Sequence, residues 1–177
     1  MTLEAAQTVV EQLTLAGQTV ATAESLTGGL VCAALVDVPG ASQVVRGAVV
    51  AYQPDVKVDA VGVDPLLIEQ FGTVDHRVAE QLADGVRVRL GADWGIGTTG
   101  VAGPGPNEGK RAGTVFVAVA GPDGVQSREL SIDADRAEVR SLAVREVLTD
   151  LQYRLGKNFD PTNVESDKEG DGDDRDA

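Results

Sequence analysis

The sequence predicts a single α/β domain with a three-layer α/β/α architecture around a mixed, mostly parallel sheet. Two observations lead to this prediction. Short apolar stretches typical of strands alternate with stretches of helical periodicity along most of the chain. Near the end, two strand-like stretches are separated only by Gly121-Pro-Asp-Gly124, which is a hairpin turn. The alternation predicts parallel strands, and the hairpin predicts one antiparallel strand among them.

The first half of the chain predicts three helices and two strands. Apolar residues recur at helical spacing from Leu3 to Leu13, and Gly17 follows as a stop signal. Pro39-Gly40 predicts a turn, and Pro54 suits the first turn of a helix because it lacks the N–H that a sheet would need. The predicted elements are helix 3–15, strand 18–23, helix 30–36, strand 44–52 and a short helix that begins at Pro54 and carries Lys57.

The second half predicts the remaining elements of the domain and a tail. A helix over 76–90 is followed by strand 94–99 and a glycine-rich loop over 99–105. The hairpin strands 113–120 and 125–132 come next, and helix 136–155 is the last element. Beyond it the composition becomes acidic and polar, so we expect one domain over 1–157 and a disordered acidic tail over 158–177.

The composition excludes several classes of function. A net charge of -13 and the absence of any Lys or Arg run argue against a nucleic-acid partner. No apolar run is long enough to span a membrane and no leader segment is recognisable, so a cytoplasmic protein without a membrane partner is expected. A single cysteine, Cys32, and a single histidine, His76, leave no disulfide or multi-histidine metal site, and neither a metal nor a cofactor is predicted.

The charge pattern also predicts an environment. The chain holds 28 acidic residues and only 15 basic ones, and only four of the latter are lysines. An acidic surface with few lysines is typical of a protein that stays soluble in a high-salt cytoplasm, where counterions screen the repulsion between carboxylates. We therefore expect a halophilic protein.

Ser25 lies in the most informative segment, Ala21-Thr-Ala-Glu-Ser-Leu-Thr-Gly-Gly29, at the predicted junction between a strand and a helix. Unpaired N–H groups at a helix start can hold a phosphate or an oxyanion, and Gly28 and Gly29 would let a ligand approach the main chain. A nucleophile or an anion site is one interpretation. The other is an ordinary helix N-cap, for which serine and threonine are common.

Lys57 is a candidate general base, because a lysine, unlike an arginine, can lose its proton when it is desolvated. Tyr52 precedes it by five residues and is close enough to share a site. A solvated surface lysine is the alternative. Loop 99–105 is interpreted either as a rigid cradle for a ligand or as a rigid turn, and Arg136, Arg140 and Arg145 either bind an anion or pair with nearby acids.

Five blocks of sequence, in order, resemble those of the CinA carboxy-terminal domain family. The blocks cover about residues 3–155 and are listed here: Ala23-Glu-Ser-Leu-Thr-Gly-Gly29, Val50-Ala-Tyr-Gln-Pro-Asp-Val-Lys57 with Val61-Gly-Val63, Thr99-Gly-Val-Ala-Gly-Pro-Gly105, Gly113-Thr-Val-Phe-Val117 and Asp135-Arg-x-x-x-Arg140. The resemblance implies an amidase that converts nicotinamide mononucleotide (NMN) to nicotinic acid mononucleotide and ammonia, in pyridine nucleotide salvage. The chain looks like the stand-alone form, and such a form is expected to be a homodimer.

The resemblance also implies roles for individual residues. Ser25 would be the nucleophile that forms an acyl-enzyme, Lys57 its base, and Tyr52 an assisting group between them. The substrate-binding residues implied are Thr27, Gly28, Gly29, Thr99, Gly103 and Arg140. The glycine amides would hold the phosphate or the oxyanion.

Three departures from the family pattern bear on loop shape and substrate fit. Asp75, Arg111 and Ala134 stand where a serine, a proline and a glycine are usual, and Leu26 replaces a cysteine without expected consequence. Two other functions stay open: a regulatory module of the same fold that binds a nucleotide without hydrolysing it, and an amidase for another carboxamide.

Overall fold

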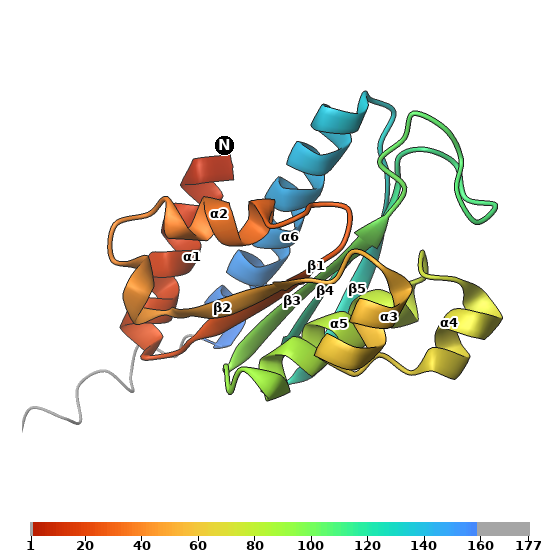
Figure 1. Cartoon of the computed structure of the whole chain (residues 1–177). Helices are drawn as coiled ribbons and strands as arrows, with labels where there is room; N and C mark the ends of the chain where they lie inside the picture. Colours follow the sequence, from red (N-terminus) through yellow and green to blue (C-terminus); the bar gives the residue numbers. More distant parts are fainter. Residues whose placement is uncertain (1, 159–177) are drawn as a thin grey trace, which may run out of the picture.

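The computed structural model describes residues 2–158 and has the three-layer α/β/α architecture that the sequence predicts (Figure 1). The strands are β1 (Val20–Glu24), β2 (Val45–Val50), β3 (Trp94–Gly100), β4 (Thr114–Gly121) and β5 (Gly124–Ser131). The helices are α1 (Thr2–Ala16), α2 (Leu30–Val36), α3 (Pro54–Val56), α4 (Pro65–Phe71), α5 (His76–Arg89) and α6 (Arg136–Asn158), with a 3-10 turn η1 (Ala41–Gln43) and a π-helical turn η2 (Lys57–Val61).

The sheet is mixed, with the strand order β2-β1-β3-β4-β5. Strand β1 pairs in parallel with both β2 and β3, whereas β4 is antiparallel to both of its neighbours. One antiparallel strand in a mostly parallel sheet is what the sequence predicted. Because Glu24 and Thr98 are paired at the ends of β1 and β3, the segments that follow these two strands meet at one edge of the sheet.

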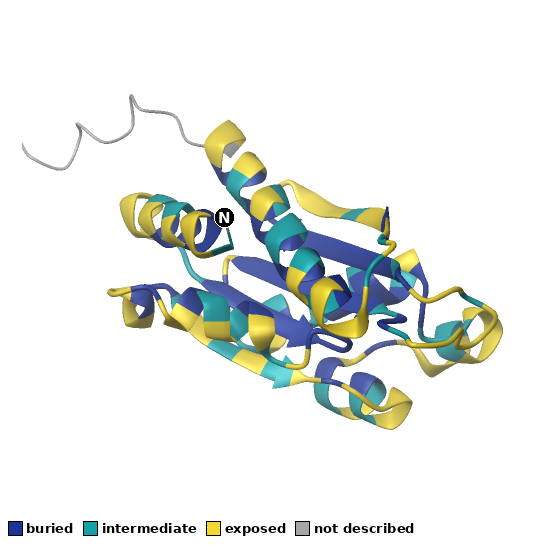
Figure 2. Cartoon of the chain, turned by 90° about the horizontal axis from the view of Figure 1, so that it is seen from above, coloured by how far each residue is buried: buried dark blue, intermediate teal, exposed yellow. Residues whose placement is uncertain are grey.

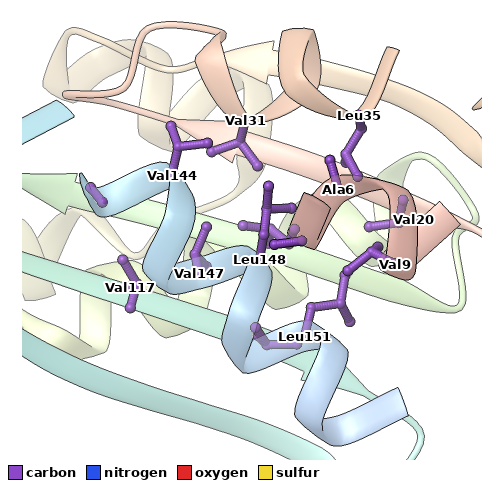
Figure 3. Packing of buried hydrophobic residues seen from close by; sticks show 14 of the residues in the cluster. Ala6, Val9, Val20, Val31, Leu35, Val117, Val144, Val147, Leu148 and Leu151 are labelled. Carbon is purple, nitrogen blue, oxygen red and sulfur yellow. The ribbon is translucent and has the colours of Figure 1, made fainter. Parts of the chain in front are cut away.

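Helices α1, α2 and α6 cover one face of the sheet and enclose the largest group of buried apolar side chains. Val9 of α1, Val31 of α2 and Leu148 of α6 meet there above the strands, as Figure 3 shows. Strands β1, β3 and β4 are buried almost throughout, whereas β5 at the edge is mostly exposed (Figure 2). Because both of their faces are covered, these inner strands consist mainly of apolar residues and glycine.

Helix α5 packs on the opposite face of the sheet, with α3 and α4 beside it (Figure 1). Two glycines of β3 allow this packing to be very close. A Cβ atom at Gly95 would lie 2.0 Å from the carbonyl oxygen of Ala83, and one at Gly97 would lie 2.2 Å from that of Ala79. Asp75 caps α5 by accepting a hydrogen bond from the Arg77 N–H at 3.0 Å, so the departure from serine at this position keeps a capping side chain.

Three details differ from the sequence-based expectations. Helix α4 was not predicted, although Asp64 caps it, Pro65 opens it and Gly72 ends it. The short helix that carries Lys57 continues as the π-helical turn η2. Helix α6 ends at Asn158, one residue into the predicted tail, and the rest of that tail, 159–177, lies outside the described residues.

Among the helices of residues 2–158, none combines the length and the apolar character that a membrane crossing requires.

Candidate active site

A cavity of about 310 Å³ lies where the segments after β1 and β3 meet. Its wall is formed by Ser25 and Leu26 after β1, by Tyr52 after β2, by Thr73 and Val74 before α5, by residues 99–107 and by Arg136 at the start of α6. The loop that follows β3 projects beyond the edge of the sheet in Figure 1. The two glycine-rich junctions singled out in the sequence therefore line one cavity.

Ser25 and Lys57 are in direct contact at the base of this site. The Lys57 Nζ donates a hydrogen bond to the Ser25 Oγ at 3.0 Å. The Ser25 N–H donates to the Thr98 carbonyl oxygen at 3.0 Å, which ties the serine to the end of β3. Lys57 is only 1% exposed and Ser25 9% exposed. Lys57 is therefore a buried partner of the serine and not a solvated surface lysine.

Burial lowers the pKa of Lys57 to about 8, while the negative charge of Glu108 opposes this shift. Desolvation, which the sequence argument gave as the reason that a lysine can lose its proton, is the main cause. The amine also donates to the carbonyl oxygens of Ala51 at 2.7 Å and Tyr52 at 3.0 Å. When the amine is neutral, these carbonyls hold its two hydrogens and its lone pair is left for the Ser25 hydroxyl.

Tyr52 contributes to the site in two ways. Its main-chain carbonyl holds Lys57, and its side chain, 54% exposed, lies at the wall of the cavity. The hydroxyl accepts a hydrogen bond from Arg136 Nη2 at 3.3 Å, and Arg136 Nη1 donates to the Gly103 carbonyl oxygen at 2.7 Å. Arg136 thus bridges Tyr52 and the glycine-rich loop across the cavity.

The start of α2 does not hold the open anion site that the sequence argument expected. The carboxylate of Glu24, which is fully buried, accepts hydrogen bonds from the N–H groups of Gly29 at 2.9 Å, Val31 at 3.0 Å and Cys32 at 2.8 Å. The chain's own acid therefore occupies the positive end of this helix. The expectation that these N–H groups are unpaired was wrong.

The substrate-binding residues implied by the resemblance divide into two groups. Thr99 and Gly103 line the cavity, and the Thr99 hydroxyl donates to the Thr73 carbonyl oxygen at 2.7 Å. The others lie behind the cavity wall. The fully buried Thr27 pairs its hydroxyl with that of Thr98 at 2.8 Å. Arg140 donates to main-chain carbonyls of residues 25–29, which we call the serine turn. Gly28 and Gly29 both have positive φ and shape that turn.

Several cavity residues have no distinct signal in the sequence. Thr73 and Val74 come from the connection between α4 and α5, where the sequence predicted no element. Glu108 accepts hydrogen bonds from the Thr73 N–H at 2.6 Å and the Thr73 hydroxyl at 2.9 Å, and so ties the β3–β4 loop to this connection. The contact joins residues 35 positions apart, which no local pattern reveals.

Residues 2–158 contain no group of three or more His, Cys, Asp and Glu placed to hold a metal ion.

Comparisons with known proteins find relatives of this chain. Residues 2–155 match the CinA C-terminal domain. A CinA-like protein of Frankia casuarinae is 49% identical over 137 residues, which are 77% of this chain and 31% of that protein. A CinA-like protein of Synechocystis is 47% identical over 143 residues, covering 78% of this chain and 34% of that protein. The chain thus spans about a third of the length of these relatives.

Solved structures resemble the whole described domain. The competence/damage inducible protein CihA from Agrobacterium tumefaciens superposes with a TM-score of 0.83 at 36% identity, covering 88% of this chain and 95% of that one. A competence-damaged protein (CinA) superfamily protein from Klebsiella pneumoniae gives a TM-score of 0.86 at 27% identity, covering 89% and 99%.

Proposed function

This chain belongs to the CinA C-terminal domain family, and from that premise we propose that it is an amidohydrolase that converts NMN to nicotinic acid mononucleotide and ammonia. One observation carries the proposal: a buried lysine of lowered pKa contacts a serine hydroxyl at the base of a cavity. A neutral amine beside a hydroxyl is the pairing that activates a serine without a histidine.

The proposed reaction has two steps. The Ser25 Oγ attacks the carboxamide carbon as its proton passes to Lys57 Nζ, and the resulting ammonium protonates the departing nitrogen to release ammonia. Water then attacks the acyl-enzyme and gives a proton to the same amine. Lys57 returns this proton to the Ser25 Oγ as the ester bond breaks, which restores the serine hydroxyl and releases the acid product. The N–H of Leu26 is a suitable oxyanion donor, because it has no acceptor among the described residues and Leu26 lines the cavity.

The walls of the cavity suit a pyridine mononucleotide. Val74, Val101 and Ala102 offer apolar surface to a planar ring. Among the described residues that line the cavity, Arg136 is the one with a cationic side chain, and a guanidinium is well matched to a phosphate. A substrate with its carboxamide at Ser25 and its phosphate at Arg136 would contact both of these lining residues.

The direct test is incubation of the purified protein with NMN in high-salt buffer, following ammonia and nicotinic acid mononucleotide. The parent should form both products in equal amounts, and Ser25→Ala should lose on the order of 10³-fold or more in kcat while keeping its circular dichroism spectrum. Saturable NMN binding without product in the parent would indicate the regulatory module instead. Product from other carboxamides but not from NMN, in a substrate panel, would indicate an amidase that acts on a different substrate.

A further inference from the structure

The segment Ser25–Gly29 is held by two charged side chains that lie outside the cavity, Glu24 and Arg140. We propose that these two are positioning residues, which together set the direction of the Ser25 hydroxyl and of the free N–H groups beside it. The proposal rests on the proposed function in so far as it concerns turnover of NMN. It gives Arg140 a different role from the substrate contact that the family resemblance implies.

Glu24 holds the end of this segment and the start of α2, because its carboxylate accepts hydrogen bonds from their main-chain N–H groups. Besides its three bonds to the start of α2, its carboxylate accepts a hydrogen bond from the Thr22 hydroxyl at 3.1 Å. A fully buried carboxylate with four donors is fixed in position, because hydrogen bonds to a charged acceptor are stronger than those between neutral groups. The start of α2, and with it Gly29, is therefore anchored to β1, the strand that ends directly before Ser25.

Arg140 holds the middle of the segment by donating hydrogen bonds to two main-chain carbonyl groups there. Its Nε donates to the Leu26 carbonyl oxygen at 2.9 Å and its Nη2 to the Thr27 carbonyl oxygen at 3.0 Å. The approach is close, because a Cβ atom at Gly28 would lie 3.3 Å from Arg140 Nη2. Two bonds from one planar guanidinium fix both position and orientation, which a lysine could not reproduce.

These contacts also set the direction of the free N–H groups. In a trans peptide the C=O and N–H of one unit point in opposite directions. Arg140 holds the Leu26 carbonyl, so the Thr27 N–H of the same unit points away from the guanidinium. The Ser25 carbonyl accepts from the Gly28 N–H at 3.1 Å, which fixes the Leu26 N–H in the same way. Neither the Leu26 nor the Thr27 N–H has an acceptor among the described residues.

Two arginines one turn apart on α6 thus have separable roles. Arg136 lines the cavity, whereas Arg140 does not, and its donors face the serine turn. Loss of Arg136 should weaken substrate binding. Loss of Arg140 should misplace the nucleophile and leave binding intact, because displacements near 1 Å cost on the order of 10²-fold in rate.

The test compares kcat and KM for NMN among Arg140→Lys, Arg140→Ala, Glu24→Gln and Arg136→Ala. We expect kcat to fall about 100-fold in Arg140→Ala and about 10-fold or more in the two conservative variants, with KM within about 3-fold. Arg136→Ala should raise KM about 10-fold or more. Arg145→Ala, which removes a charge from the same helix but contacts Glu146, serves as the control and should match the parent. A raised KM with unchanged kcat in Arg140→Lys would overturn the proposal.

A second readout is independent of the substrate. A fluorophosphonate probe reports the reactivity of Ser25 through its rate of covalent labelling, and this rate should fall in Arg140→Lys and Glu24→Gln but not in Arg145→Ala. Labelling of the parent without NMN turnover would overturn the proposed substrate alone. Equal labelling of the parent and both conservative variants would overturn the positioning role. If Arg140→Ala does not fold, Arg140→Lys carries the test.

Discussion

At the scale of single residues, the chemistry depends on how one amine is surrounded. Lys57 Nζ has three oxygen partners, two of them main-chain carbonyls of residues 51 and 52. Such a site stabilises the ammonium through hydrogen bonds and destabilises it through burial. Burial has the larger effect, and the pKa is therefore lowered. The amine can therefore accept a proton near neutral pH, which an exposed lysine with a pKa near 10.4 cannot do.

The pH dependence of turnover should report this amine. Because the neutral form acts as base, kcat/KM for NMN should rise with pH through about 8 and level off above it, so that activity at pH 7 is about a tenth of the plateau. Lys57→Arg keeps the positive charge but cannot release a proton. That variant should lose on the order of 10³-fold in kcat/KM and show no rise with pH. A flat parent profile between about pH 6.5 and 9.5 would exclude Lys57 as the base.

Sequence reasoning reached the reactive pair but not its surroundings. Ser25 and Lys57 stand in recognisable blocks, and the family resemblance implied their roles as nucleophile and base, whereas the residues alone left a helix cap and a surface lysine as alternatives. The capping of α2 by Glu24 and the separate positions of Arg136 and Arg140 depend on side-chain directions in three dimensions. Spacing of four on a helix indicates a shared face and does not say what each side chain contacts.

At the scale of secondary-structure elements, the site depends on the very close packing of β3 against α5. Small residues in β3 bring the helix backbone next to the strand, and the end of β3 lies beside the segment before α5, where the Thr99 hydroxyl donates to the Thr73 carbonyl oxygen in the cavity wall. The sequence predicted both elements from their periodicities. Helix α4 was missed because it is short and has no buried residue, so no apolar stripe marks it.

Adding a methyl group at this contact should destabilise the fold. In Gly97→Ala the new Cβ would lie 2.2 Å from the Ala79 carbonyl oxygen and 2.7 Å from the Ala83 nitrogen, so the backbones must separate. We expect a loss of about 2 kcal/mol or more in the free energy of unfolding, measured by urea denaturation. Gly156→Ala is the matched control. Gly156 is exposed in α6 with only ordinary contact at 3.8 Å, so alanine should stabilise the protein by about 0.5–1 kcal/mol. Equal stability of the two variants would contradict the close packing.

At the scale of the whole molecule, the strand order and the charge are the main features. The order β2-β1-β3-β4-β5 places β1 between two parallel partners, an arrangement that needs a crossover connection on each side of the strand. The sequence predicted the hairpin β4–β5 from its turn, but the neighbours of β1 are separated from it by long connections that carry no pairing signal. The homodimer and the high-salt environment stay predictions.

The acidic composition makes a prediction about salt that belongs to the whole chain. At a net charge of -13 the folded state repels itself, and the repulsion is screened as the Debye length falls to about 3 Å near 1 M salt. The Tm, followed by circular dichroism, should therefore rise from salt-free buffer to about 1 M KCl. A variant ending at residue 159 lacks eight acids and two bases and carries -7, so its Tm should rise less. The comparison separates charge screening from a general effect of salt on apolar burial, because only screening scales with the charge removed. An identical rise in both chains would assign the effect to burial, and no rise in either would contradict adaptation of this protein to high salt.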